Sequence, residues 1–174
     1  MNDGGDNSFK AVRAEATSKY QIYRWGANYS RALPGEWQFR AVVTGQYTTN
    51  ALVPGEQFGF GGADSVRGFN IREVANDKGY SSQLEIYTPE LGAKFAWKDT
   101  KMRLLGFYDA GSASRNSIQP GELSGMSGGS MGVGMRMTYG KHLNVRVDYA
   151  QVIDPAGLQS RGDQMLQASV AVPF

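Results

Sequence analysis

Few side chains in this sequence are of the types that perform chemistry. The 174-residue chain contains one histidine, His142, and no cysteine. The lack of cysteine excludes a disulfide framework and a thiolate metal site, and His142 lies in a short turn without a serine or cysteine nucleophile motif nearby. The glycine-rich stretch at residues 56–69 fits neither the G-x-x-x-x-G-K-S/T pattern nor a strand–G-x-G-x-x-G–helix pattern for binding phosphate. We therefore predict that the protein is not an enzyme and has no catalytic residue, cofactor or metal site.

Arg67 is the side chain most in need of a chemical partner. It lies within residues 56–69, E-Q-F-G-F-G-G-A-D-S-V-R-G-F. This stretch is too rich in glycine to form a regular strand or helix and too apolar for a solvated linker. A loop of this kind packs back against the protein, and a buried guanidinium then requires a carboxylate partner. The alternative is that Arg67 is a solvated loop charge.

Alternation of apolar and polar residues predicts strands on both sides of this loop. We expect strands near residues 8–16, 20–32, 37–48, 80–88, 102–111, 131–139, 143–150 and 164–174. The alternation slips by one residue near 17–19 without a glycine or proline, so one long, bulged strand could replace the first two. The connections at 34–35 and 140–142 are short and that at 89–100 is of medium length, whereas those at 50–79, 112–125 and 153–163 are long. Short turns at one end and long loops at the other are typical of outer-membrane barrels.

The two faces of the expected strands differ in chemistry. One face is apolar and carries Tyr, Trp or Phe at several strand ends, as in the aromatic girdles of membrane barrels. The opposite face carries the charged residues Arg40, Glu85, Arg103, Asp109, Arg136, Arg146 and Asp148. We predict an all-β fold, an antiparallel up-and-down transmembrane β-barrel of about eight strands or half of a larger barrel, with residues 1–174 as a single domain. The alternative is a soluble β-sandwich with one dry face.

Composition agrees with a barrel and excludes several other classes. Mean hydropathy is −0.41, and no apolar run approaches the ~20 residues of a membrane helix. A net charge of +2 gives no nucleic-acid footprint, so we expect no nucleic-acid partner. Residues 1–7 lack the basic and apolar regions of a signal peptide. An exported protein of this sequence would therefore be a mature form or a piece of a longer chain.

Three motifs in the chain have a recognisable combination of residues and spacing. G-G-A-D-S-V-R-G-F at residues 61–69 is similar to a GG-x-x-SVRG-aromatic loop, and F-Y-D-A-G at 107–111 is similar to an F-x-D-x-G strand motif. Gly79 is followed six residues later by Glu85, in the strand directly after the loop. Together they resemble the C-terminal part of the two-partner secretion transporters, the haemolysin secretion/activation proteins of the ShlB/FhaC/HecB family, whose superfamily also contains the insertase BamA.

The resemblance covers nearly the whole chain and implies its architecture. Members of the family carry POTRA domains and about sixteen barrel strands, within the range of such barrels. This chain contains no POTRA-like unit and has room for seven or eight strands. It therefore resembles the last half of such a barrel, with residues 50–79 as the loop that folds into the lumen.

The resemblance also implies a lock between this loop and the barrel wall. In the family, the loop arginine bonds the aspartate of F-x-D-x-G, which here corresponds to Arg67 and Asp109. Alternation places Asp109 on the polar face, as the pairing requires. The residues of the implied lock are Arg67, Gly68, Phe69, Phe107, Asp109 and Gly111; Glu85 and Arg136 are candidate further partners in the lumen, and Phe174 resembles the terminal signal read by the barrel-assembly machinery.

The function implied by the resemblance is translocation of a large secreted partner, such as a haemolysin or filamentous adhesin, across a Gram-negative outer membrane. The expected partners are outer-membrane lipid, the secreted protein and the barrel-assembly machinery, and a homodimer could supply the missing half of the barrel. Two alternatives remain: a small eight-stranded outer-membrane anchor or adhesin without a conduit, and a BamA-like assembly factor.

Overall fold

A computed structural model describes residues 5–95, 99–140 and 143–172. Within these ranges, seven strands form one antiparallel sheet in the order β1-β2-β5-β6-β7-β8-β9. The strands are β1 (Tyr23–Ala32), β2 (Gln38–Tyr47), β5 (Lys78–Tyr87), β6 (Thr100–Ser114), β7 (Gly125–Tyr139), β8 (Leu143–Asp154) and β9 (Gln164–Ala171). Each strand of the sheet pairs with the next one along the chain, so the predicted all-β, up-and-down antiparallel fold is confirmed.

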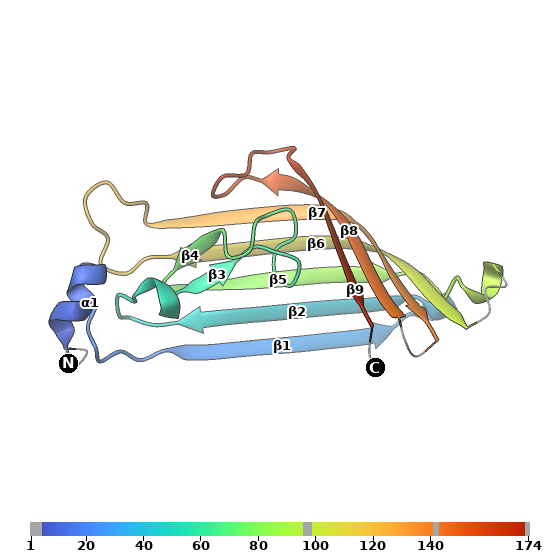
Figure 1. The fold of residues 1–174 in the computed structure, drawn as a ribbon, viewed down its shortest axis with the longest axis horizontal. Coiled ribbons are helices and arrows are strands. Elements are labelled where there is room, and N and C mark those ends of the chain that lie inside the picture. The colour runs from blue at the N-terminus through green and yellow to red at the C-terminus, as the bar shows by residue number, and fades with distance from the viewer. Residues whose placement is uncertain (1–4, 96–98, 141–142, 173–174) are drawn as a thin grey trace.

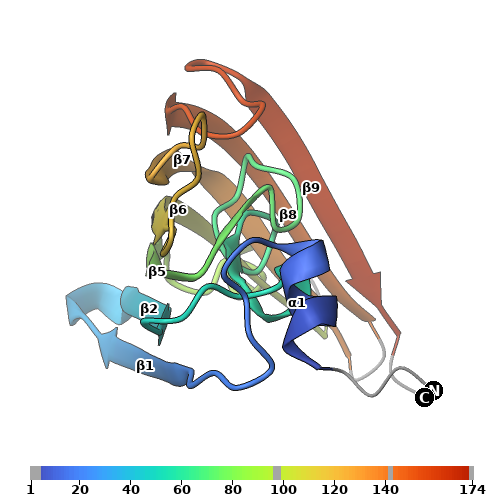
Figure 2. The same cartoon turned by 90° about the vertical axis from the view of Figure 1, so that its left-hand side faces the viewer.

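The sheet is strongly curved but does not close. Figure 2 views it from one end and shows the strands curving around the segment between β2 and β5, with β1 and β9 at the two edges. The form with eight closed strands is therefore not the one observed. The open sheet has the shape expected of part of a larger barrel.

The seven strands have a polar concave face and an apolar convex face. Residues directly opposite each other in adjacent antiparallel strands share a face, and the register sets Arg40 opposite Glu85, and Glu85 opposite Phe107, on the concave face. The convex face exposes large apolar side chains on every strand, among them Trp25, Tyr29, Leu84, Ile86, Leu104, Tyr108, Met131, Val133, Tyr149, Leu166 and Val170. A band of this kind has the composition of a surface that contacts lipid.

The connections between strands differ at the two ends of the sheet (Figure 1). The turn end carries the connection between β1 and β2, which contains the 3-10 turn η1 (Pro34–Glu36), and the connection between β5 and β6, which contains η3 (Ala93–Phe95). The loop end carries residues 48–77, 115–124 and 155–163, as well as the N-terminal segment. The expected alternation of short and long connections holds only in part, because the connection between β5 and β6 (residues 88–99) is longer than residues 115–124 and 155–163.

The N-terminal segment corrects one prediction. Residues 8–16 were expected to form a strand, but α1 (Asp6–Val12) occupies most of this range. Among the described residues of this segment, Ala16 alone forms a β-bridge, an isolated one with Ala51. Asp6 in the first turn and Lys10 in the last turn both favour the helix dipole. No helix among the described residues is long and apolar enough to cross a membrane.

Candidate functional site

Residues 48–77, which we call the arm, fold back onto the concave face of the sheet (Figures 1 and 2). The arm contains the 3-10 turn η2 (Pro54–Glu56) and the short antiparallel strands β3 (Phe58–Phe60) and β4 (Val74–Asn76). Its buried side chains Phe60, Val66, Phe69 and Val74 pack in one cluster with Ala113, Val152 and Ala156 of the sheet and the adjoining loop. Burial of each large apolar side chain contributes about 1.5–3 kcal/mol. The main hydrophobic core of the described chain therefore lies between the arm and the sheet.

Two glycines allow the arm to turn tightly at its tip. Gly61 has a φ of +115°, and a Cβ there would lie 2.3 Å from the carbonyl oxygen of Asn70. Gly68 has a φ of +86°, and a Cβ there would lie 3.3 Å from the Cβ of Ala150. Backbone bonds from Gly62 N–H to the carbonyl of Phe69 and from Arg72 N–H to that of Gly61 close the tip. The turn directs the side chain of Arg67, which directly precedes Gly68, toward the sheet.

Arg67 and Asp109 form a buried bidentate ion pair. Arg67 Nε donates to Asp109 Oδ2 at 2.7 Å, and Nη2 donates to Asp109 Oδ1 at 2.8 Å. The backbone N–H of Arg67 also donates to Oδ2 at 3.1 Å. Both side chains are 0% exposed. This fork geometry is the strongest common arrangement between a guanidinium and a carboxylate.

Arg67 has two further carboxylates and one aromatic ring around it. Its Nη1 donates to Glu85 Oε1 at 2.9 Å and to Asp148 Oδ1 at 3.5 Å. Its guanidinium carbon lies 3.6 Å from the centroid of the Phe107 ring, within the range of a cation–π interaction. Each of the three guanidinium nitrogens donates to at least one carboxylate, so Arg67 ties the arm to β5, β6 and β8 at once.

One guanidinium cannot neutralise three buried carboxylates, and three other arginines balance the charge. Arg40 Nη1 donates to Glu85 Oε2 at 2.9 Å. Arg136 Nη1 and Arg146 Nε each lie 2.8 Å from an oxygen of Asp148. These three side chains keep part of their surface in solvent, whereas the carboxylates do not. The carboxylates of Glu85, Asp109 and Asp148, which we call the acidic centre, therefore surround Arg67. The three partly exposed arginines lie around them.

The residues expected in the lock occupy the following positions. Phe69 packs edge-on against Phe60, with ring centroids 6.3 Å apart. Gly111 lies under the Phe60 ring, and a Cβ there would be 2.6 Å from a ring carbon. Arg136 reaches the cluster through Asp148 and lies 3.9 Å from Glu85. Phe174 lies outside the described residues.

Sequence reasoning missed the role of Asp148 and Arg146 in this cluster. Both were placed on the polar face, but no motif marks them. Arg146 Nη1 donates to Asp64 Oδ1 at 2.9 Å, and its Nη2 bonds the carbonyl oxygen of Ala63. The strand β8 thus holds the tip of the arm from the side opposite to β5. The sequence offered one signal for these two residues: both lie on the polar face of β8, which is two strands away from β6 in the sheet.

Two carboxylates of the arm connect it to the other segments at the loop end. Glu73 accepts bonds from the backbone N–H groups of Asn70 at 2.7 Å and Leu158 at 2.6 Å. Asp77 is fully buried and accepts bonds from the Arg13 guanidinium and from the backbone N–H of Leu52 at 2.9 Å. Burial acts to raise the pKa of both carboxyls, but these donors outweigh it and hold each pKa below its usual value.

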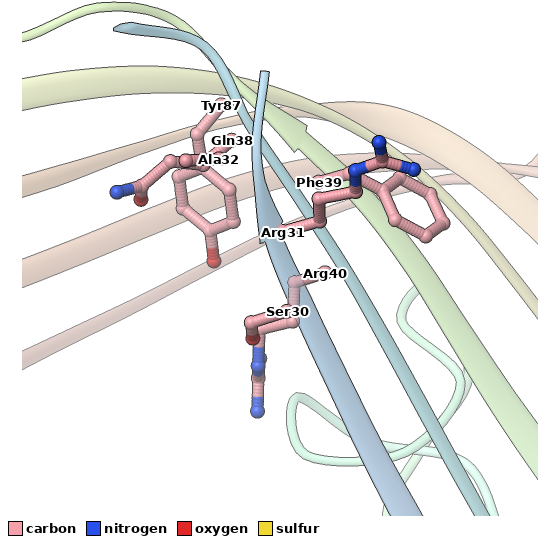
Figure 3. A pocket seen from close by; sticks show the side chains of 7 residues that line it. All are labelled: Ser30, Arg31, Ala32, Gln38, Phe39, Arg40 and Tyr87. Carbon is pink, nitrogen blue, oxygen red and sulfur yellow. The ribbon is translucent and has the colours of Figure 1, made fainter.

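A cleft of about 340 Å³ lies at the turn end, next to the acidic centre (Figure 3). Its lining residues are Ser30, Arg31, Ala32, Gln38, Phe39, Arg40 and Tyr87. Arg31 and Phe39 lie on one side of the β1–β2 pair in Figure 3, while Arg40 and Tyr87 lie toward the other. The Tyr87 hydroxyl donates to Glu85 at 2.8 Å. The cleft therefore lies beside the Arg40–Glu85 pair, with Arg40 in its lining.

Comparison with known proteins assigns the chain to a family. The family model described as "Haemolysin secretion/activation protein ShlB/FhaC/HecB" matches residues 3–135. The chain belongs to this family. The match contains Arg67, Phe107 and Asp109, whereas Asp148 and β9 lie beyond it. The comparison with curated protein sequences gave no match.

Two solved structures share the fold. CdiB from Escherichia coli superposes with a TM-score of 0.76 at 18% sequence identity, over 100% of this chain and 30% of CdiB. CdiB from Acinetobacter baumannii superposes with a TM-score of 0.65 at 23% identity, over 89% of this chain and 27% of that protein. The chain thus spans less than a third of the length of either. The resemblance inferred from the motifs is confirmed, and the open curved sheet corresponds to part of a larger β-barrel protein.

Proposed function

We propose that this chain is part of the outer-membrane β-barrel of a two-partner secretion transporter, which moves a large haemolysin- or adhesin-like protein out of a Gram-negative cell. The observation that carries the proposal is the fully buried Arg67–Asp109 pair on the concave face. A buried guanidinium that binds carboxylates on three strands holds the arm against the sheet, which a solvated surface charge would not do. Membership of the haemolysin secretion/activation family supports the same conclusion.

The two faces of the sheet suit the two environments of such a barrel. The convex face is apolar on every strand and suits contact with lipid. The concave face carries the arginines and carboxylates around Arg67 and suits a water-filled path. The strands of the sheet have 8 to 15 residues, and a tilted membrane strand needs about 9–11. The longer strands β6 and β7 extend past β5 at the turn end, because residues 100–104 of β6 lie beyond Leu105, the last residue that pairs with β5.

The mechanism we propose involves no covalent chemistry, and the residues act by holding the arm. The arm occupies the space inside the curve of the sheet, which is the space a passing polypeptide would need. Arg67 fixes the tip of the arm to β6 through Asp109. The position of the arm would then set whether the path is closed or open.

The two edge strands require partners in this proposal. In the described chain β1 and β9 each pair on one side, and an open edge is not tolerated within the hydrocarbon layer. Further strands of a longer chain, or a second copy of this one, would complete the barrel. The mass of the protein in detergent separates these, since a strict monomer excludes the homodimer.

Secretion and conductance together test the proposed function. A bacterial host expressing the protein with a haemolysin- or adhesin-like partner should release that partner into the medium, and Arg67→Ala, in which the arm opens more often, should increase ion conductance through the path. The matched control is Arg161→Ala, because Arg161 makes a solvent-exposed pair with Asp154. In liposomes the wild-type protein should conduct ions. Absence of both secretion and conductance would support an anchor without a conduit and overturn the proposal.

A further inference from the structure

The arm has a second buried ion pair at its base, and the cation comes from outside the arm. Arg13 belongs to the N-terminal segment, directly after α1. Its Nη2 donates to Asp77 Oδ2 at 2.8 Å, and its Nη1 bonds Asp77 Oδ1. The side chains are 11% and 0% exposed. This pair has the same bidentate form as the pair of Arg67 with Asp109, at the opposite end of the arm.

The pair joins four separate segments of the chain. Besides Asp77, Arg13 donates to the carbonyl oxygens of Leu52 at 2.7 Å and Asn116 at 3.0 Å. Asp77 in turn accepts the backbone N–H groups of Leu52 at 2.9 Å and Asn116 at 2.7 Å. Leu52 lies in the first part of the arm and Asp77 at its end, while Asn116 belongs to the loop after β6. One guanidinium and one carboxylate thus fix the N-terminal segment, both ends of the arm and a neighbouring loop.

The N-terminal segment depends strongly on this pair for its position. The helix α1 contains no buried residue. Apart from Arg13, the close packing of the described segment is at Ala16, which is 0% exposed and forms a bridge with Ala51, 4% exposed. Figure 2 shows α1 in front of the arm, on the open side of the curved sheet. The segment therefore crosses the arm close to its base, where it is held by Arg13, Ala16 and two hydrogen bonds of the Gln21 backbone with Thr48 and Asn50.

We propose that Arg13 is a positioning residue for the arm. Through its bond to Asp77, Arg13 holds residues 5–22, which we call the strap, across the base of the arm. The strap fixes the orientation in which the arm enters the lumen. This inference rests on the proposed function only for its effect on transport. The ends of the arm are covalently continuous with β2 and β5, but the chain between each end and the tip can still take several conformations. The contacts of Arg13 with Asp77 and Leu52 reduce that freedom, because a loop fixed at more points has fewer conformations.

Hydrogen–deuterium exchange on the purified protein in detergent tests the contact itself. Arg13→Gln removes the charge and most donors, while Asp77 keeps its backbone donors, so the barrel is expected to stay folded. Exchange of residues 50–57 and 113–118 should become at least about tenfold faster, since a hydrogen bond to a charged group is worth this factor or more. Arg161→Gln is the matched control and should leave exchange unchanged. Equal exchange in Arg13→Gln and wild type would overturn the proposal.

An engineered disulfide separates positioning from a merely structural role. The chain has no cysteine of its own, so Ala16→Cys with Ala51→Cys can join the strap to the arm at their observed bridge. In the Arg13→Gln background, oxidation should restore slow exchange and reduction should remove it again. Each single cysteine variant controls for the substitution. Failure of the formed disulfide to restore slow exchange would contradict the strap.

The effect on transport is read separately, by single-channel recording in planar bilayers. Arg13→Gln should make openings at least about tenfold more frequent, and the oxidised cysteine pair should return them to the wild-type rate. Altered exchange with unaltered openings would leave the strap in place but reject the arm as the gate, and with it the effect proposed for Arg13 on transport. Unaltered exchange rejects the strap itself, whatever the openings do.

Discussion

Removal of the Arg67 side chain is the most informative single perturbation. In Arg67→Ala, the carboxylates of Glu85, Asp109 and Asp148 lose the cation that lies between them, while remaining almost completely buried. Breaking a buried ion pair from one side costs about 3–5 kcal/mol. At 1.36 kcal/mol per factor of ten, this corresponds to roughly a 100- to 5,000-fold increase in opening of the arm.

The arm should open more often in this variant without leaving the sheet permanently. Phe60, Val66, Phe69 and Val74 remain buried between the arm and the sheet. Four side chains of this kind contribute about 6–12 kcal/mol, which exceeds the loss at Arg67. The variant is therefore expected to populate the docked arm at equilibrium and to expose it transiently.

Native-state hydrogen exchange measures this opening directly. Peptides that cover residues 58–76 should exchange faster in Arg67→Ala by the factor given above, whereas the strand interior at 128–136 should be little changed. Arg67→Lys should fall between, because it keeps the charge but loses the fork. Exchange of residues 58–76 within twofold of wild type would refute the reasoning, since it would mean that the buried pair does not hold the arm.

Three further perturbations follow from the geometry of the arm, two near its tip and one at its base. Phe107→Leu removes the ring beneath the buried guanidinium and should increase arm exchange by about 10- to 30-fold, the equivalent of a desolvated cation–π contact. Gly111→Ala places a Cβ 2.6 Å from the ring of Phe60 and should lower the thermal midpoint by several degrees, as overpacking costs about 1–3 kcal/mol. Burial raises the pKa of the Asp77 carboxyl, but the hydrogen bonds from Arg13, Asn116 and Leu52 outweigh burial and lower this pKa in the folded protein. The ionised carboxylate therefore stabilises the fold fully above the ordinary carboxyl pKa of about 3.9. This stabilisation is lost as the pH falls through the lower pKa of the folded state. A spin label in α1 should therefore become more mobile below about pH 4. In the Asp77→Asn variant, the same label should already be mobile at neutral pH, and its mobility should no longer depend on pH.

Much of the fold could be predicted because alternation reports directly on a sheet with two different faces. The period of two located the seven strands of the sheet and put Asp109 and Glu85 on the polar face, where the structure also has them. The tight turn at Pro34 and the glycine-rich arm were marked by residue types with strong backbone preferences. The same rule failed at residues 8–16, because a short alternating stretch forms a strand only where another strand is present to pair with it.

The partners of the site were less predictable, because charge pairing at long range leaves no local pattern. Arg13 and Asp77 are separated by 64 residues, and nothing in the neighbourhood of either points to the other. Asp148 has the same position in the alternation as several ordinary lumen residues and is distinguished only by its depth under the arm. Curvature of the sheet, which brings β8 close to β5 across the arm, decides these contacts and is a property of the whole fold.

The central claim is that the arm occupies the path taken by the secreted protein. Its most direct test is single-channel conductance in planar bilayers, with wild type compared with a variant in which residues 58–76 are replaced by a short Gly-Ser linker. Our account predicts a mostly closed wild-type channel and a wider, persistently open channel in the variant. Equal conductance and equal open times in the two proteins would contradict it.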